Sequence, residues 1–249
     1  PVSPVRKAYV RTRRTIYYTY MKEYKGLLFL DLDGTFFRWS LFLYMVDKLI
    51  ETGIFNEMIR KHFNVEEKKW RERKGSYDEY LYKVIEIFEA RISGVKVEDF
   101  ELLGREMVAE YKDQVYRYTR ELIKEKKEQG WYITAISCSP EEAVKPFAEA
   151  WGMNESHAAE IEQVDGRYTS MRSVPHDKAS IAQKIMQRPE FADIPKENIW
   201  GIGDSEGDIN FLEIVGHPIC FNPTLPLYQE AQKRGWNVVV ERKDVVYHI

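Results

Sequence analysis

The chain has 249 residues, enough for one large domain or for a core with an inserted unit. Hydrophobic residues make up 44% and charged residues 31%, as in ordinary soluble proteins, and the net charge of −3 excludes a general attraction to nucleic acids or membranes. The two cysteines, Cys138 and Cys220, lack the spacing of a disulfide framework or a metal site. No apolar run is long enough to span a bilayer, and the N-terminal stretch lacks the apolar part of a secretory signal. We therefore expect a cytoplasmic location and no membrane partner.

Residues 1–21 are predicted to form a basic N-terminal extension. The first twenty residues contain five basic side chains and no acidic one, and three tyrosines follow the basic run closely. One interpretation is an arm that binds nucleic acid or anionic lipid. We favour the other interpretation, a surface extension, because a short basic run is usually just solvated. Nucleic acid is therefore not an expected partner.

The stretch from Gly26 to Leu30 is predicted to be a buried strand, because it is short, almost wholly apolar and begins with a glycine. Asp31 and Asp33 follow it directly. Side chains two residues apart on an extended chain point the same way, so the two carboxylates can face one cavity at the carboxyl end of the strand. Their mutual repulsion predicts a divalent cation held by oxygen ligands.

Residues 38–125 are predicted to be a helical insertion. Apolar residues recur at helical spacing in 77–88 and 100–115, and the composition of 41–50 also favours a helix. The basic run at 124–127 is predicted to lie in the last turn of a further helix, which ends at Gly130. Nothing in this segment alternates convincingly in the manner of a strand.

Strands and helices alternate after residue 130, which predicts a mainly parallel sheet. The predicted fold class is therefore α/β, with a Rossmann-like core formed by residues 22–37 and 126–249. A hairpin is expected around the turn Asp165–Gly166. The expected strands are residues 131–136, 198–202, 218–221 and 237–240, and the expected helices are residues 140–151 and 179–186.

Two serines follow the predicted strand 131–136. Ser137 lies at the strand tip beside a helix N-terminus, which is a natural site for an anion. Ser139 is explained by local structure alone. It is predicted to be the N-cap of a helix in which Pro140 is the first residue and Glu142 completes a capping box.

Lys178, Asp204 and Asp208 complete the set of candidate site residues. Lys178 lies at a helix start, where the helix dipole disfavours a cation unless the ammonium group reaches an anionic ligand. Asp204 follows a predicted strand and can complete the oxygen shell of a cation held by Asp31. Asp208 can hold metal-bound water, or it can serve a helix start, because Ser205 to Asp208 also has capping-box spacing.

These stretches resemble the four motifs of the haloacid dehalogenase superfamily, the phosphohydrolases with an aspartate nucleophile. The motifs are Asp-Leu-Asp-Gly-Thr at 31–35, Ser137, Lys178 and Gly-Asp-Ser-Glu-Gly-Asp at 203–208, in the order of the family. The helical stretch between the first two motifs is similar to the helical cap of some members. The residues around 137–140 look most like the branch that contains phosphoserine phosphatase, subfamily IB.

The resemblance implies a role for each site residue. Asp31 would attack phosphorus and form an aspartyl-phosphate, and Asp33 would protonate the leaving oxygen and then activate water. Ser137 and Lys178 would neutralise the charge on the phosphoryl oxygens. The implied cofactor is Mg²⁺. The implied metal-site residues are Asp31, Asp33, Asp204 and Asp208, and the further phosphate-binding candidates are Gly34, Thr35 and Cys138.

The predicted function is that of a Mg²⁺-dependent phosphomonoester hydrolase acting on a small phosphorylated metabolite. Ser40 occupies the position at which phosphoserine phosphatases carry a glutamate for the substrate ammonium group, which argues against phosphoserine. Arg71 and Arg73 lie near the place of a substrate-binding arginine in that branch, although an exposed charged loop is an equal alternative. Three alternatives stay open: phosphoserine phosphatase proper, a phosphotransferase using the same aspartyl-phosphate, and a non-catalytic binding module with a basic arm. Nothing in the sequence indicates the oligomeric state.

Overall fold

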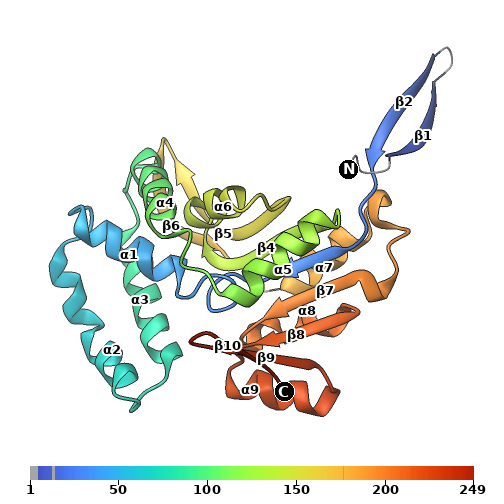
Figure 1. The fold of residues 1–249 in the computed structure, drawn as a ribbon. Helices are drawn as coiled ribbons and strands as arrows, with labels where there is room; N and C mark the ends of the chain where they lie inside the picture. Colours follow the sequence, from blue (N-terminus) through green and yellow to red (C-terminus); the bar gives the residue numbers. More distant parts are fainter. Residues whose placement is uncertain (1–4, 13–14, 176) are drawn as a thin grey trace.

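The computed structural model describes residues 5–12, 15–175 and 177–249, and its centre is an eight-stranded sheet (Figure 1). The strand order is β10-β9-β8-β7-β3-β4-β5-β6. The six strands from β9 to β5 are parallel, and the edge strands β10 and β6 are antiparallel to their neighbours. The predicted α/β fold with a mainly parallel sheet is therefore confirmed. The strands are β3 (Leu27–Leu30), β4 (Tyr132–Pro140), β5 (Glu155–Val164), β6 (Arg167–Ser173), β7 (Ile199–Gly203), β8 (His217–Phe221), β9 (Asn237–Arg242) and β10 (Val245–His248).

The central strand β3 is apolar throughout because both of its faces are covered. Leu28 and Leu30 belong to a buried cluster that includes residues of α1, α5 and α6, whereas Leu27 and Phe29 belong to a cluster with residues of α7, α8 and α9. Alternation of side chains along a strand produces this division. The helices that follow β4 are α6 (Glu141–Ala150), α7 (Lys178–Met186), α8 (Ile209–Ile214) and α9 (Leu225–Arg234), with short 3-10 helices at Pro189–Phe191, Lys196–Asn198 and Glu206–Asp208 (η4).

The segment between β3 and β4 is helical, as predicted. In Figure 1, α1 to α4 lie to one side of the sheet, whereas α5 lies against β4. The division of the chain into a cap at 38–125 and a core at 22–37 and 126–249 stays a prediction. The helices of this segment are α1 (Leu41–Glu51), α2 (Asn64–Arg71), α3 (Tyr77–Arg91), α4 (Val97–Tyr111) and α5 (Arg117–Glu128), with the 3-10 helix η1 (Glu57–His62) between α1 and α2.

Part of this helical segment is tied directly to the sheet and its helices. Helix α4 crosses α6 so closely that a Cβ at Gly104 would lie 1.9 Å from the backbone oxygen of Glu142. The loop between α3 and α4 also pairs with the β5–β6 hairpin. The Gly94 amide donates to the Tyr168 carbonyl, and the Tyr168 amide donates to the Val95 carbonyl, both at 2.9 Å. These contacts hold the carboxyl-terminal end of α3 against the hairpin.

Several element boundaries differ from the predictions. Strand β4 continues to Pro140 and α6 begins at Glu141, so the predicted N-cap at Ser139 is wrong; its hydroxyl bonds to other partners. Strand β10 and helix α9 were not predicted. Strand β10 has only four residues, which is too short for an apolar period of two to be recognised. The hairpin at Asp165–Gly166 is confirmed, and both turn residues have positive φ, as such a turn requires.

The N-terminal extension contains a two-stranded antiparallel hairpin, β1 (Val5–Thr12) and β2 (Thr15–Lys22), separate from the main sheet (Figure 1). Residues 1–4, 13 and 14 of the extension lie outside the described residues. The favoured interpretation of the extension as a solvated surface segment stays a prediction, and so does the alternative of a binding arm. Among the described helices, none combines the length and the apolar character needed to cross a membrane.

Candidate active site

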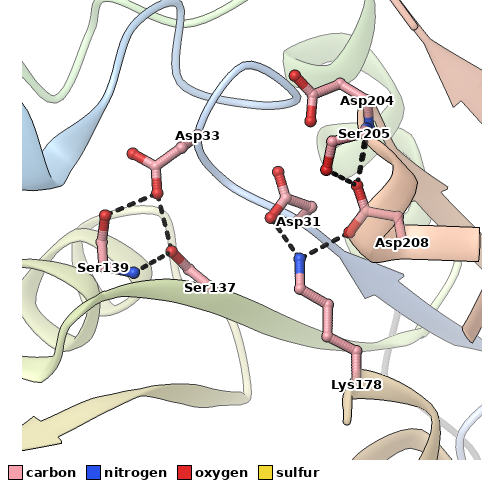
Figure 2. Close-up of polar contacts among 8 residues, drawn as sticks. All are labelled: Asp31, Asp33, Ser137, Ser139, Lys178, Asp204, Ser205 and Asp208. Carbon is pink, nitrogen blue, oxygen red and sulfur yellow. Dashed lines mark hydrogen bonds and ion pairs between the residues drawn. The ribbon is translucent and has the colours of Figure 1, made fainter. Parts of the chain in front are cut away.

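Five predicted site residues from distant parts of the sequence meet at the carboxyl ends of the central strands (Figure 2). Strand β3 leads into Asp31 and Asp33, and it pairs in parallel with β4 on one side and with β7 on the other. Ser137 lies near the end of β4, and Asp204 directly follows β7. Lys178 is the first residue of α7. The site is therefore assembled at the edge of a parallel sheet at which such folds bind their ligands.

Lys178 lies between two carboxylates at the centre of the site. Its Nζ donates to Asp31 Oδ1 at 2.7 Å and to Asp208 Oδ1 at 2.6 Å, and its side chain is 7% exposed. Burial alone would lower the pKa of Lys178, but the negative charges of Asp208 and Asp31 outweigh burial and raise the pKa. The ammonium group is therefore positively charged at neutral pH, and the anionic partner expected for a lysine at this helix start is present.

The remaining carboxylate oxygens leave an excess of negative charge. Asp31 Oδ2 is buried and has no hydrogen-bond partner among the described residues. Burial raises the pKa of Asp31 to about 7; Lys178 opposes this rise, and the charges of Asp208 and Asp33 add to it. Burial and the neighbouring charge of Asp31 also raise the pKa of Asp204. Ligand oxygens of Asp31, Asp204 and Asp208 lie within 4.8 Å of one another. The orphaned oxygen and this spacing fit a divalent cation with oxygen ligands.

Asp33 is held by three hydrogen bonds, one of which comes from a residue that sequence reasoning missed. Ser137 Oγ and Ser139 Oγ each donate to Asp33 Oδ2 at 2.8 Å (Figure 2). The Leu41 amide donates to Asp33 Oδ1. Burial raises the pKa of Asp33, and the bonds from Ser139, Leu41 and Ser137 oppose that rise. Ser139 Oγ also accepts from the Phe42 amide at 3.0 Å. The second carboxylate is thereby connected to the first turn of α1.

Ser139 could have been found from the sequence by the argument already used for the two aspartates. Ser137 and Ser139 are two residues apart on β4, so their side chains point the same way. The capping pattern explained Ser139 fully at the local level. For this reason the spacing of two between Ser137 and Ser139 was not used to predict that Ser139 also faces the site. In the structure, α6 begins without a side-chain cap.

Asp208 caps η4 and also binds Lys178. Asp208 Oδ2 accepts from the Asp204 amide at 3.0 Å and from the Ser205 amide at 3.1 Å, and the predicted capping box of Ser205 and Asp208 is present. A Cβ at Gly203 would lie 2.4 Å from the Asp208 side chain, so this approach requires a glycine. The orientation of Asp208 is therefore fixed by backbone amides. Its direct contact with a metal stays a prediction.

The predicted phosphate-binding residues lie around the same carboxylates. Gly34 has a φ of +81°, and a Cβ there would lie 2.1 Å from Asp204 Oδ2, so glycine is needed for conformation and for space. The hydroxyl of Thr35 is buried and finds no partner in the part of the chain that the structure describes. Partial burial raises the pKa of the Cys138 thiol, which argues against an activated thiolate.

The predicted substrate residues have local partners. Ser40 is the N-cap of α1, where it accepts from the Leu43 amide at 3.3 Å. Arg71 donates to Glu67 Oε1 through two nitrogens, at 2.7 and 2.9 Å. Arg73 is exposed and follows the end of α2, with a positive φ. A contact of either arginine with a substrate stays a prediction.

Comparison with known proteins identifies the family. Residues 28–213 match the haloacid dehalogenase-like hydrolases, and the chain belongs to this family. The match includes every residue of the site described above.

Curated relatives carry the names of phosphatases. A probable phosphatase of Mycobacterium tuberculosis is 33% identical over 125 residues, which cover 50% of this chain and 44% of the relative. A phosphoserine phosphatase of the same organism is 27% identical over 154 residues, which cover 60% of this chain and 49% of the relative. The chain thus spans about half the length of these relatives. A histidinol-phosphatase of Neisseria meningitidis is 25% identical over 223 residues, covering 86% of this chain and 98% of the relative. The predicted enzyme class agrees with these names.

Solved structures share the fold. A protein of unknown function from Bordetella pertussis has a TM-score of 0.67 at 19% identity, covering 86% of this chain and 98% of that one. A phosphoserine phosphatase, solved as an analogue of its phospho-aspartyl intermediate, has a TM-score of 0.57 at 20% identity. The match covers 89% of this chain and 96% of that one. The resemblance to the branch that contains phosphoserine phosphatase is confirmed at the level of fold.

Proposed function

We propose that this protein is a Mg²⁺-dependent phosphomonoester hydrolase that forms an aspartyl-phosphate on Asp31 and acts on a small phosphorylated metabolite. The observation that carries the proposal is the state of the Asp31 carboxylate. Lys178 holds one of its oxygens, and the other is buried and unpartnered beside Asp204 and Asp208. A structural carboxylate would have both oxygens satisfied, whereas one that binds a metal and attacks phosphorus needs a free oxygen.

Four groups would hold the cation: the carboxylates of Asp31 and Asp204, the backbone carbonyl of Asp33, and Asp208 either directly or through water. Bound Mg²⁺ would neutralise the surplus charge of the aspartates and would polarise the phosphoryl group. Three carboxylates and one ammonium group leave a net charge near −2 when all are ionised, which is the charge that a divalent cation balances.

In the first chemical step, an Asp31 oxygen would attack phosphorus while the bond to the alcohol oxygen breaks. Asp33 would supply the proton to that leaving oxygen, and it would remove a proton from water in the second step, when water releases phosphate from Asp31. Lys178 and Ser137 are the donors available to the phosphoryl oxygens. Ser137 would turn from Asp33 toward the phosphoryl group, and Ser139 and the Leu41 amide would keep Asp33 in place.

The substrate is proposed to differ from phosphoserine, although two relatives that this chain matches over 49% and 29% of their length are named phosphoserine phosphatases. Ser40, at the position of the expected glutamate, is buried and its hydroxyl caps α1, so it provides no anionic partner for an ammonium group. A relative that matches 86% of this chain, over 98% of its own length, is named a histidinol-phosphatase, so the names of the relatives include a substrate other than phosphoserine.

The test is hydrolysis of 4-nitrophenyl phosphate with and without Mg²⁺, by the wild type and by Asp31→Asn. We expect turnover that requires the metal and is lost in the variant. Because asparagine preserves the shape of the side chain and removes the nucleophilic charge, thermal unfolding should show a folded variant. Turnover that survives in Asp31→Asn would contradict the proposed nucleophile. Transfer of phosphate to an added alcohol would show the phosphotransferase alternative.

A further inference from the structure

We propose that Trp39, Trp70 and Tyr77 form an aromatic wall beside the catalytic carboxylates, and that this wall selects phosphate monoesters whose alcohol carries a cationic nitrogen group and no carboxylate. This inference rests on the proposed function, because it specifies the substrate class of the same site.

The three side chains of the aromatic wall contact one another. The ring centroids of Trp39 and Trp70 are 5.3 Å apart, those of Trp70 and Tyr77 are 5.4 Å apart, and those of Trp39 and Tyr77 are 6.2 Å apart. Tyr80 is buried and stacks on Trp70 with an interplanar angle of 12°, so the position of Trp70 is supported. The wall residues themselves are only half-buried. Each of the three residues therefore keeps some exposed surface in this structure.

Backbone contacts place Trp39 next to the metal-binding carboxylates. The Gly34 amide donates to the Trp39 carbonyl at 3.1 Å. A Cβ at Gly34 would lie 2.1 Å from Asp204 Oδ2. Gly34 therefore contacts both the backbone of Trp39 and the carboxylate of Asp204.

Tyr77 approaches the same carboxylates from the start of α3. Its pKa is raised, first by burial and then by the negative charge of Asp33, and Asp204 adds to the effect. The neighbouring Ser40 side chain opposes this rise. Tyr77 also contacts the ring of Trp39, with 6.2 Å between the centroids, so it lies on the side of the site where Asp33 is proposed to protonate the leaving oxygen.

The charges around the aromatic wall favour a cation. Asp78, the residue after Tyr77, has a raised pKa because of burial and then because of the charge of Glu206, the first residue of η4. Arg71 lies 5.8 Å from the ring centroid of Trp70, but its charge is paired with Glu67. Acidic groups and the electron-rich faces of aromatic rings both attract a cation and both disfavour a carboxylate.

The replacement of the expected glutamate by Ser40 indicates which kind of cation fits. A glutamate would bind a primary ammonium group through a charged hydrogen bond, and Ser40 offers no such partner. Alkylated ammonium and imidazolium groups need fewer hydrogen bonds and gain more from ring faces, with tryptophan the strongest aromatic partner. The aromatic wall therefore suits this weakly hydrated class of cation.

Two matched pairs of substrates test the inference at saturating Mg²⁺. Phosphocholine is compared with 3,3-dimethylbutyl phosphate, which has the same shape and no positive charge. We expect kcat/KM to be at least about tenfold higher for phosphocholine, because a cation–π contact in a desolvated site is of that order. Phosphoethanolamine is compared with phosphoserine, which differs by its carboxylate. We expect phosphoethanolamine to be the better substrate of the two.

Variants of the wall connect the preference to these residues. In Trp70→Leu, the phosphocholine to dimethylbutyl phosphate ratio should fall toward one, and Trp70→Phe should retain part of it. Tyr82→Leu is the control, since Tyr82 also lies on α3 and is 68% exposed. If Trp70→Leu does not fold, Trp39→Leu provides the same comparison.

An equal rate for phosphocholine and its neutral isostere, a preference for phosphoserine, or a ratio unchanged in Trp70→Leu would each overturn the inference. If the wild type hydrolyses 4-nitrophenyl phosphate and shows no cation preference, the proposed function stands and only the aromatic wall fails. If it hydrolyses none of these esters with Mg²⁺, both fail.

Discussion

The substitution Ser139→Ala would show how the second carboxylate of the site is controlled. The Ser139 hydroxyl donates to Asp33 Oδ2 at 2.8 Å and accepts from the Phe42 amide at 3.0 Å, and Ser139 is 3% exposed. In the variant, Asp33 keeps its bonds from Ser137 and from the Leu41 amide. The change therefore loosens the Asp33 carboxylate without removing it.

The expected effect depends on the leaving group. A hydrogen bond to a charged group contributes about 1.5–3 kcal/mol, and about 1.4 kcal/mol corresponds to a tenfold change in rate. We therefore expect kcat/KM for an alkyl phosphate such as phosphoethanolamine, which covers the steps up to release of the alcohol, to fall about 10- to 100-fold. The 4-nitrophenolate ion leaves without a proton, so kcat/KM for 4-nitrophenyl phosphate should fall by less than about threefold. Activation of water by Asp33 follows release of the alcohol and does not enter kcat/KM.

Steady-state kinetics on both esters provides the assay, with thermal unfolding as a check that the variant is folded. Ser173→Ala, an exposed serine on β6, is the matched control and should leave both rates unchanged. An equal loss of kcat/KM on the two esters would refute the reasoning. It would mean that Ser139 supports the fold or the phosphoryl group, and not the position of the proton donor Asp33.

Three further predictions concern the charges of the site. Lys178→Met leaves Asp31 and Asp208 buried without their cation, so the free energy of unfolding in urea should fall by about 3–5 kcal/mol, and added Mg²⁺ should restore part of it. In metal-free protein the pKa of Asp31 is raised to about 7, so between about pH 4 and 7 the native state retains a proton that the unfolded state releases. The unfolding temperature should therefore fall as the pH rises through this range. In Asp31→Asn the unfolding temperature should depend less on pH. Gly34→Ala introduces a methyl group 2.1 Å from Asp204 Oδ2 and should weaken Mg²⁺ binding measured by calorimetry.

Each of these predictions has an outcome that would contradict it. Unchanged stability of Lys178→Met would show that the two carboxylates do not depend on the ammonium group. An unfolding temperature that rises from about pH 4 to 7 would place the native pKa of Asp31 below its unfolded value. Gly94→Ala is the control for Gly34→Ala, because Gly94 has a φ of +85° and no atom within 4 Å of an added Cβ. If both variants bind Mg²⁺ with the affinity of the wild type, contact with Asp204 has no effect on the metal site.

Local patterns were sufficient to predict most elements and the first carboxylates of the site. Asp31 and Asp33 follow an apolar strand at a spacing of two, and this pattern depends only on the geometry of an extended chain. The turn at Asp165–Gly166 is equally local, because both residues adopt positive φ. The same reliance on local chemistry misplaced Ser139, whose capping pattern was satisfactory but whose hydroxyl binds Asp33, 106 residues away.

The sequence by itself determined which chemical groups the site contains and at which strand ends they lie, because these follow from residue type and from short-range backbone geometry. Only the tertiary structure decided which groups share a proton or a charge. The pairing of β3 with β4 places Ser139 on Asp33, and its pairing with β7, together with the packing of α7 on α8, brings Lys178 between Asp31 and Asp208. The contacts of α3 likewise bring Tyr77 to the carboxylates. Such contacts depend on strand register and helix packing across more than a hundred residues, and no local pattern contains that information.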